Sequence, residues 1–238
     1  VRDLAAPPVI NAELLAEQTS CNASAPNGAL RAYVLEGGSQ VTAGYNFFWY
    51  RGANTVTPAR PGYSGGAVVD GLPAGTYRLV VENATTGCTA TLDLDVPENI
   101  VYPVLSLDAQ QDQTNCDPTN YDGGASVSVG GNTTDYDFYW FAGNVFSPDT
   151  TASVLSNSAD ITGLAAGTYT AFAANKVTRC LSNPIRVTID DQTWNPVVNA
   201  LLGNPQEACD PALANGALEA SVDETSRGGG SDVTAGYT

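Results

Sequence analysis

The sequence contains no histidine and no methionine, and its only lysine is Lys176. Without histidine, neither a Ser-His-Asp triad nor a Cys-His pair can be assembled. A Ser-Lys arrangement would depend on Lys176 alone. Paired carboxylates such as Asp135 and Asp137 occur on alternate residues of an acidic segment, where they are usually just solvated. We therefore expect a protein that is not an enzyme.

Positive charge is also scarce. Nine Lys and Arg face 25 Asp and Glu, which gives a net charge of -16. Nucleic acid is excluded as a partner, because no basic patch could neutralise its phosphates. No apolar run approaches the roughly 18 residues needed to cross a bilayer, and no segment resembles a signal peptide. The 43% hydrophobic content is that of a folded chain.

What the sequence does contain is an internal repeat. The string "CNASAPNG" from Cys21 returns as "CDPTNYDG" from Cys116 and as "CDPALANG" from Cys209. The string "GLPAGTY" at 71–77 returns as "GLAAGTY" at 163–169. Several landmarks share this spacing, so the chain consists of tandem units.

The repeat register divides the chain. We expect a tail of a preceding repeat (1–7), a first repeat (8–97), a linker (98–102), a second repeat (103–191), a linker (192–195) and a partial third repeat (196–238). The third unit stops just after "DVTAGYT", where a complete unit continues into its aromatic strand. The register predicts a piece of a longer repetitive chain. The alternative is a half-domain completed by strands of another chain.

Each unit has the pattern of an antiparallel sandwich. Short runs alternate apolar and polar residues between Gly, Pro and Asn, and helical periodicity is absent. We expect strands in the first unit near 9–15, 29–35, 45–51, 66–70, 76–82 and 89–96, and a weaker one near 55–59. Asn-Gly and Asp-Gly pairs, such as Asn27-Gly28, suggest tight turns with positive φ. The predicted fold is all-β, with tandem immunoglobulin-like sandwiches of seven or so strands.

Alternation along the strands assigns side chains to a core. The predicted core aromatics are Tyr45, Phe47, Trp49, Tyr77, Tyr136, Phe138, Trp140 and Tyr169. The tyrosines at 77 and 169 each follow a Gly-Thr turn, where a hydroxyl can bond back to the loop backbone as in a tyrosine corner.

Five cysteines in a strand-rich acidic chain indicate an oxidising compartment. Each complete unit holds two, so we predict the disulfides Cys21–Cys88 and Cys116–Cys180. Metal-binding or catalytic cysteine is disfavoured, since there is no CxxC and no His. Cys209 would be unpaired, or paired outside this sequence.

The series "CNASAPNGALRAYV", "YNFFWYRG" and "GLPAGTYRLVVENATTGCTATLDLDV" resembles the SprB-type repeats of giant Bacteroidota cell-surface adhesins and extracellular appendages. This resemblance implies a secreted, immunoglobulin-like repeat strung in long arrays, with roles in gliding, attachment or prey-grappling. The loops of this sequence, such as residues 51–66, are longer than those of a typical repeat of the family.

Some aromatic side chains alternate away from the predicted core. The candidate interface residues are Phe48, Tyr50, Tyr139, Phe141 and Phe172. Exposed apolar groups often mark interaction sites. Alternatively, the domain's own loop at 51–66 or 142–159 folds over them, or they stack on carbohydrate.

Acidic residues gather at strand ends and linkers. Candidate calcium sites lie at the two junctions, with Asp93, Asp95 and Glu98 at one and Asp190 and Asp191 at the other, where oxygen ligands of adjoining domains could converge. The alternative is a solvated acidic surface. No other cofactor is expected.

Two functions follow. The chain is either a structural segment of a giant extracellular fibre, associating with other copies of itself and with neighbouring repeats, or a ligand-binding adhesin module. A fibre predicts that the outward aromatics are buried between chains; a binding module predicts that they are exposed.

Overall fold

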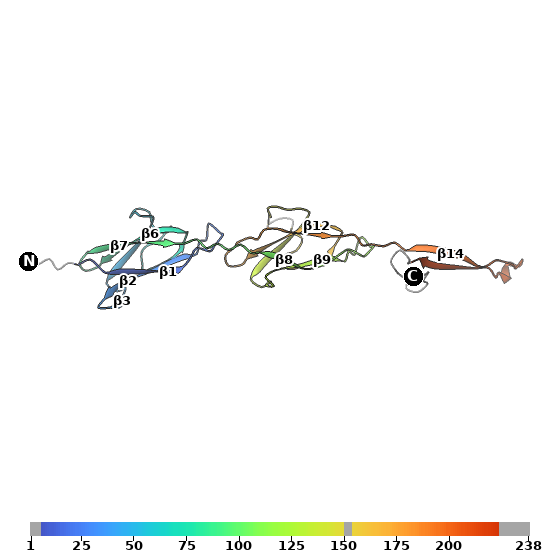
Figure 1. Ribbon diagram of the computed structural model, residues 1–238, viewed down its shortest axis with the longest axis horizontal. Coiled ribbons are helices and arrows are strands. Elements are labelled where there is room, and N and C mark those ends of the chain that lie inside the picture. Colours follow the sequence, from blue (N-terminus) through green and yellow to red (C-terminus); the bar gives the residue numbers. More distant parts are fainter. Residues whose placement is uncertain (1–5, 150–153, 224–238) are drawn as a thin grey trace, which may run out of the picture.

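The computed structural model describes residues 6–149 and 154–223. It shows three units in line along one axis, joined end to end (Figure 1). The ending "DVTAGYT" and part of the 142–159 loop lie outside the described residues. Among the residues that the structure describes, every regular element except one short 3-10 helix is a strand.

The first domain is built from two antiparallel sheets. Its strands are β1 (Ile10–Ala16), β2 (Gly28–Glu36), β3 (Ser39–Val41), β4 (Tyr45–Arg51), β5 (Val68–Leu72), β6 (Gly75–Asn83) and β7 (Thr89–Val96). In one sheet β2 pairs with β1, β3 and β5; in the other, the order is β4-β6-β7. The expected weak strand near 55–59 is reduced to an isolated bridge between Tyr50 and Pro58.

The second domain repeats this arrangement. Its strands are β8 (Leu105–Gln111), β9 (Gly123–Val129), β10 (Tyr136–Ala142), β11 (Asp160–Leu164), β12 (Gly167–Asn175) and β13 (Ile185–Ile189). The sheets are β11-β9-β8 and β10-β12-β13. Strand β3 has no counterpart here among the described strands. The prediction of an all-β chain of immunoglobulin-like sandwiches is confirmed.

Each sandwich has its own hydrophobic core, centred on a tryptophan from the middle of the aromatic strand. Trp49 and Trp140 are almost completely buried. Their indole Nε1–H groups donate to the carbonyls of Gly66 at 3.2 Å and Ser158 at 3.1 Å. The remaining core aromatics named from the sequence lie in the same two clusters, with Tyr45 and Tyr136 at the margins.

The tyrosine at the start of β6 and of β12 bonds back to the preceding loop. Tyr77 Oη donates to Pro73 O at 2.7 Å, and Tyr169 Oη donates to Ala165 O at 3.0 Å. This is the tyrosine-corner geometry that the Gly-Thr-Tyr pattern suggested. Each bond holds the loop at the end of the sandwich from which the next linker leaves.

The expected positive-φ turn at Asn27-Gly28 is wrong. Neither Gly28 nor Gly123 has a positive φ. Both begin a strand at a close approach between the sheets: a Cβ on Gly28 would lie 2.5 Å from Val96 Cγ1 and 2.6 Å from Leu72 O. Glycine is required there for space, and the preceding Asn has a different role, described below.

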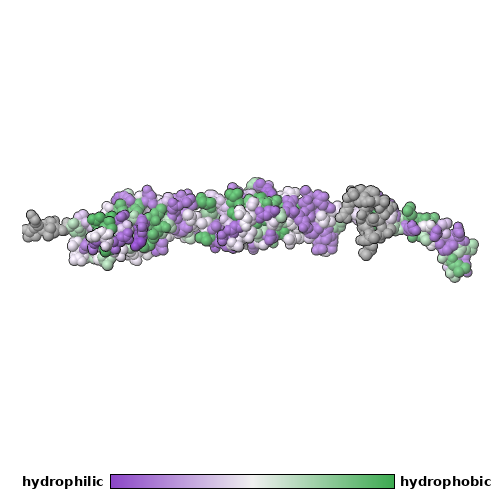
Figure 2. All heavy atoms as spheres, turned by 60° about the horizontal axis from the view of Figure 1, so that its bottom comes forward, coloured by the Kyte–Doolittle hydropathy of each residue, from purple (hydrophilic) through white to green (hydrophobic). Residues whose placement is uncertain are grey.

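The third unit is described as one hairpin, β14 (Val197–Asn204) and β15 (Ala217–Asp223), with the helix η1 (Pro211–Leu213) between them. No second sheet covers it within the described residues. Leu202 and Leu218 are accordingly exposed. Figure 2 shows hydrophobic side chains on the surface of this hairpin, next to hydrophilic ones.

No helix in the described part of the chain has the length and apolarity to cross a membrane.

Candidate functional site

The linker that leaves the first domain is pinned to a loop near the start of the domain. Gln18 N–H donates to Pro97 O, and Asn99 N–H donates to Gln18 O, both at 2.9 Å. Gln18 and Glu98 therefore form an isolated parallel β-bridge. The direction in which the chain enters the next domain is fixed by backbone hydrogen bonds.

The loop itself, residues 18–27, is held by two amide side chains; we name it the Cys21 loop. The buried Gln18 donates from Nε2 to Ser20 O at 2.8 Å and accepts from Asn27 N–H through Oε1 at 2.9 Å. Asn27 Oδ1 in turn accepts the backbone N–H groups of Thr19 and Ser20 at 2.8 and 3.2 Å. These bonds hold Cys21 at the junction.

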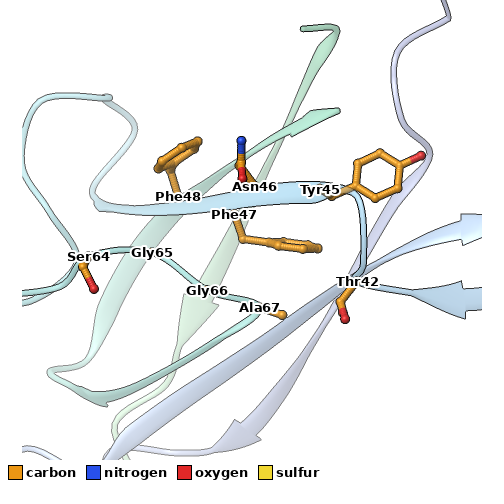
Figure 3. Close-up of a pocket in the computed structure, with 9 residues that line it drawn as sticks. All are labelled: Thr42, Tyr45, Asn46, Phe47, Phe48, Ser64, Gly65, Gly66 and Ala67. Atoms are coloured by element: carbon orange, nitrogen blue, oxygen red, sulfur yellow. The ribbon is translucent and has the colours of Figure 1, made fainter. Parts of the chain in front are cut away.

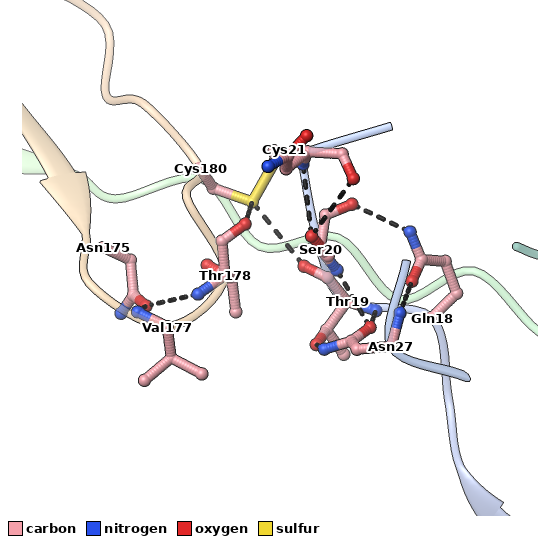
Figure 4. The surroundings of a disulfide bond; sticks show 10 residues. Gln18, Thr19, Ser20, Cys21, Asn27, Asn175, Val177, Thr178 and Cys180 are labelled. Carbon is pink, nitrogen blue, oxygen red and sulfur yellow. Dashed lines mark hydrogen bonds between the residues drawn. A yellow bond between two sulfur atoms is a disulfide. The ribbon is translucent and has the colours of Figure 1, made fainter. Parts of the chain in front are cut away.

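Cys21 is bonded to Cys180 of the second domain, 159 residues away, with 4.9 Å between the Cα atoms. Figure 4 shows the bond with the Cys21 loop on one side and the turn that ends at Cys180 on the other. Cys88, Cys116 and Cys209 are free. The predicted pairs Cys21–Cys88 and Cys116–Cys180 are therefore wrong, because the bond joins two domains.

The reason for the error is strand direction. Cys21 precedes β2, whose first residue, Gly28, packs against Val96 at the end of β7. Cys88 precedes the other end of β7, an eight-residue strand. An extended strand of that length spans roughly 26 Å. The two cysteines of one domain thus lie at opposite ends of the sandwich, too far apart for the 4.4 to 6.8 Å that a disulfide needs between Cα atoms.

The second domain contributes a tight turn, residues 175–180, which we name the Cys180 turn. Asn175 Oδ1 accepts the N–H groups of Val177 and Thr178, both at 2.9 Å, and Arg179 adopts φ of 59°. Across the junction, Cys21 N–H donates to Thr178 O at 2.8 Å. The Cys180 side chain is completely buried. The junction is closed by one covalent bond and one backbone hydrogen bond.

The candidate interface aromatics divide into two groups. Phe48, Tyr50 and Tyr139 are half-buried, with part of each ring open to solvent. The expectation of exposure is wrong for Phe141 and Phe172, which retain 4% and 1% of their accessible surface. Their rings meet edge to face at 6.0 Å.

The start of the 142–159 loop is bonded to the same face of β12 that carries Phe172. Thr170 Oγ1 donates to Gly143 O at 2.6 Å and accepts Val145 N–H at 3.2 Å. These bonds lay the loop on the outer face of β12, beside Phe172. The domain's own loop therefore lies against part of the outer face of the second domain.

In the first domain, an open pocket of about 340 Å³ lies beside β4. Phe47 and Phe48 project to opposite sides of that strand, and Ser64, Gly65 and Gly66 form the other wall (Figure 3). Phe48 is the outward aromatic that this pocket leaves accessible. It is the strongest candidate contact for a ligand or partner on this domain.

The candidate calcium residues are not gathered. No group of three or more His, Cys, Asp or Glu side chains suited to a metal occurs among the described residues. Asp93 is held instead by Arg78, through bonds of 2.8 and 2.7 Å. Asp95 accepts from Thr76 Oγ1 at 2.6 Å. Asp191 accepts Thr193 N–H at 2.9 Å.

Neither protein-family models nor curated proteins match the chain. Among solved structures, it is similar to three N-terminal domains of the Highly Immunogenic Outer Capsid protein (Hoc) of bacteriophage RB49, with 13% identity and a TM-score of 0.38 over 91% of this chain and 69% of that one. The Ig1–Ig3 ectodomain of mouse nectin-like molecule 4 gives 16% and 0.27 over 81% and 67%. Fibronectin(III)-like modules of Clostridium thermocellum CbhA give 13% and 0.28 over 77% and 95%.

Because these TM-scores are low, the function has to be inferred from the geometry of the chain itself. What that geometry provides is a row of immunoglobulin-like sandwiches in which two consecutive domains are joined by a disulfide.

Proposed function

We propose that this chain is a tension-carrying segment of a secreted fibre or appendage, built from tandem sandwiches and without catalytic activity. The observation that carries the proposal is the Cys21–Cys180 bond. Because it joins two consecutive domains, it decides how a pull along the chain is transmitted.

The bond changes the route that an applied force takes. When the chain is pulled from both ends, tension passes from residue 21 through the sulfur atoms to residue 180. The intervening residues, which hold most of both cores, are removed from the line of force. A segment that must resist extension benefits from this arrangement, whereas a module that only binds a ligand does not need it.

The end-to-end arrangement supports the same proposal. The two domains and the third hairpin follow one another along a single axis (Figure 1). The net charge of -16 keeps such a surface soluble. A disulfide fits an oxidising compartment, and we place the protein at the cell surface or outside the cell. The resemblance to giant adhesin repeats agrees with this location.

A second function, a ligand-binding adhesin module, is favoured by the pocket beside β4. Phe48 is accessible there, and aromatic rings are common contacts for sugars and proteins. Binding of a glycan to the isolated chain, lost in Phe48→Ala and retained in Tyr139→Ala, would support that function. Association with other copies would instead bury Phe48 and Tyr50 between chains.

Single-molecule stretching tests the main proposal. With the disulfide intact, the residues between the two cysteines cannot extend. After reduction, or in Cys180→Ser, extension should grow by about 500 to 600 Å, because a stretched chain gains at most about 3.6 Å per residue over the released segment. Equal extension with and without the bond would contradict the proposal. Cys88→Ser is the matched control and should extend like the unmodified chain.

A further inference from the structure

The free cysteines occupy the same structural positions as the bonded pair. Cys116 stands in the second domain where Cys21 stands in the first, and Cys88 stands in the first domain where Cys180 stands in the second. The chain therefore contains one complete junction, Cys21 with Cys180, which serves as an internal reference for the unmatched halves.

The loop around Cys116 reproduces the Cys21 loop. Gln113, which is buried, donates to Asn115 O at 2.5 Å and accepts Asp122 N–H at 2.8 Å. Asp122 Oδ1 accepts the N–H groups of Thr114 and Asn115 at 2.7 and 3.1 Å. Each of these bonds has a counterpart made by Gln18 and Asn27.

The exit of the chain is also the same at both loops. Gln113 N–H donates to Asp190 O at 3.0 Å, and Gln192 N–H donates to Gln113 O at 2.7 Å. At the first junction Gln18 makes the same two bonds to Pro97 and Asn99. The linkers of the first and second domains therefore leave in the same direction. A domain that follows the second would lie beside Cys116, as the second domain lies beside Cys21.

Both loops border a pocket at this end of their domain. The pocket beside Cys116 measures about 380 Å³ and the one beside Cys21 about 480 Å³. Their walls come from equivalent positions of the repeat, such as Pro73 and Ala165 from the corner loop. The two cysteines differ in bonding: Cys21 is bonded to Cys180, whereas Cys116 is an exposed free thiol whose Sγ donates to Trp194 O at 3.4 Å.

The turn before Cys88 reproduces the Cys180 turn. Asn83 Oδ1 accepts the N–H groups of Thr85 and Thr86, both at 3.0 Å. Asn83 N–H donates to Cys88 O at 2.9 Å, as Asn175 N–H does to Cys180 O at 3.0 Å. Gly87 takes the left-handed position of Arg179, with φ of 69°. The turn is formed in advance of any partner, and Cys88 is only partly buried.

We infer that Cys88 and Cys116 are the two complementary halves of the same inter-domain lock. Each bonds to an adjoining sandwich of this kind: Cys116 to the second cysteine of a domain that follows, and Cys88 to the first cysteine of a domain that precedes. The rule is that the first cysteine of one domain bonds to the second cysteine of the next.

The third repeat carries the same first half. Gln206 Nε2 donates to Ala208 O at 2.9 Å, and Gln206 Oε1 accepts Asn215 N–H at 2.7 Å. Asn215 Oδ1 accepts Glu207 N–H at 3.0 Å, and Cys209 is exposed. The site is thus built three times, and in the one case where the following unit includes its second cysteine, Cys180, it holds a disulfide.

Bond formation consumes two thiols and yields one disulfide. The two electrons and two protons pass to a small disulfide oxidant such as oxidised glutathione, which is released as two thiols. The thiolate of one cysteine attacks that oxidant, and the thiolate of the other then displaces the second glutathione. No further co-reactant is needed.

The inference rests on the proposed function and extends it. Bonds that overlap in this way, each spanning two domains, would keep tension on the sulfur bridges along a whole array. Its test is independent of the stretching experiment, since the connectivity can be wrong even where the Cys21–Cys180 bond does limit extension.

The experiment uses the full chain doubled at its repeat boundary: residues 1–195 fused to residues 8–238. Asn195 then precedes Pro8 in place of Pro196, so the "PV" start of the repeat is preserved. The fusion is oxidised with a glutathione pair, and its disulfides are mapped by mass spectrometry after proteolysis without reduction. We expect the bond Cys21–Cys180 in each half and one new bond between Cys116 and Cys88.

Single substitutions distinguish the two copies. Cys116→Ser in the first half, or Cys88→Ser in the second half, should abolish the new bond. The matched controls, Cys88→Ser in the first half and Cys116→Ser in the second, should leave it at full yield. Loss of the bond in the controls, its absence in the unsubstituted fusion, or its formation only between separate fusion molecules would overturn the inference.

Discussion

Cys21 and Cys180 belong to different domains, yet their Cα atoms lie 4.9 Å apart. A bond in this position limits the unfolding of both domains, because either one would unfold as a closed loop of roughly 80 residues, for which the chain-entropy model gives about 4.5 kcal/mol. Cys21→Ser should therefore destabilise both domains by up to about that amount and loosen their junction. Thermal unfolding and small-angle scattering measure the two effects.

Cys88→Ser provides the control for this prediction. It leaves the inter-domain bond in place, so the thermal transitions and the scattering curve of the isolated chain should not change. A loss of stability confined to the first domain in Cys88→Ser would contradict the observed pairing. It would support the Cys21–Cys88 pairing within the first domain instead.

The two domains should unfold independently, because each has its own tryptophan-centred core. Trp140 is fully buried in the core of the second domain, and that core shares no residue with the core of the first. Trp140→Ala should cost the second domain about 3 to 5 kcal/mol. Measured by urea unfolding of the reduced chain, the first domain should keep its own transition. A matching loss in both domains would show that the cores are not independent.

The tyrosine corner should contribute a measurable hydrogen bond. Tyr77 Oη donates to Pro73 O at 2.7 Å, and Tyr77 is fully buried. Tyr77→Phe should lower the free energy of unfolding of the first domain by about 1 kcal/mol. Tyr50→Phe, which removes a hydroxyl from a half-exposed ring, is the control and should have no effect. Equal free energies of unfolding for the two variants would show that the corner hydrogen bond does not stabilise the domain.

The stability of the loop around Cys116, held by Gln113 and Asp122, should fall in acid. The stability of the Cys21 loop should not. The Thr114 hydroxyl, together with backbone N–H groups, holds the pKa of Asp122 below its ordinary value. A lowered folded-state pKa contributes stability that is present above the unfolded value, about 3.9, and is lost as pH falls through the folded value. Asn27 occupies the same position in the first domain and does not titrate.

Asp122→Asn is the matched test of that pH dependence. Its amide can accept the same two N–H bonds and donate to Thr114, as Asn27 donates to Thr19 Oγ1 at 2.8 Å. The variant should match the unmodified chain at neutral pH and resist local opening below about pH 4. Hydrogen exchange of the Thr114 and Asn115 amides measures this opening. Faster exchange of the variant at neutral pH would show that the charge itself is needed.

The sequence by itself determined the repeat, the strands and the cores. Alternation along a strand is a local property, so Phe47 and Trp49 could be assigned to the interior from their spacing alone. The tyrosine corner follows likewise from Gly-Thr-Tyr at the start of a strand. The Gln and Asn or Asp residues that flank each first cysteine recur in all three units, and this recurrence was the signal that could have revealed the junction loop.

Only the tertiary structure decided which cysteines meet and which aromatics are covered. Cysteine pairing depends on the directions in which β2 and β7 run and on the end at which the next domain arrives, and neither is encoded in the spacing of residues within one unit. The burial of Phe141 and Phe172 likewise depends on the pairing of β10 with β12, which brings the two rings together. Both are contacts between segments far apart in the chain, which the local alternation of side chains does not determine.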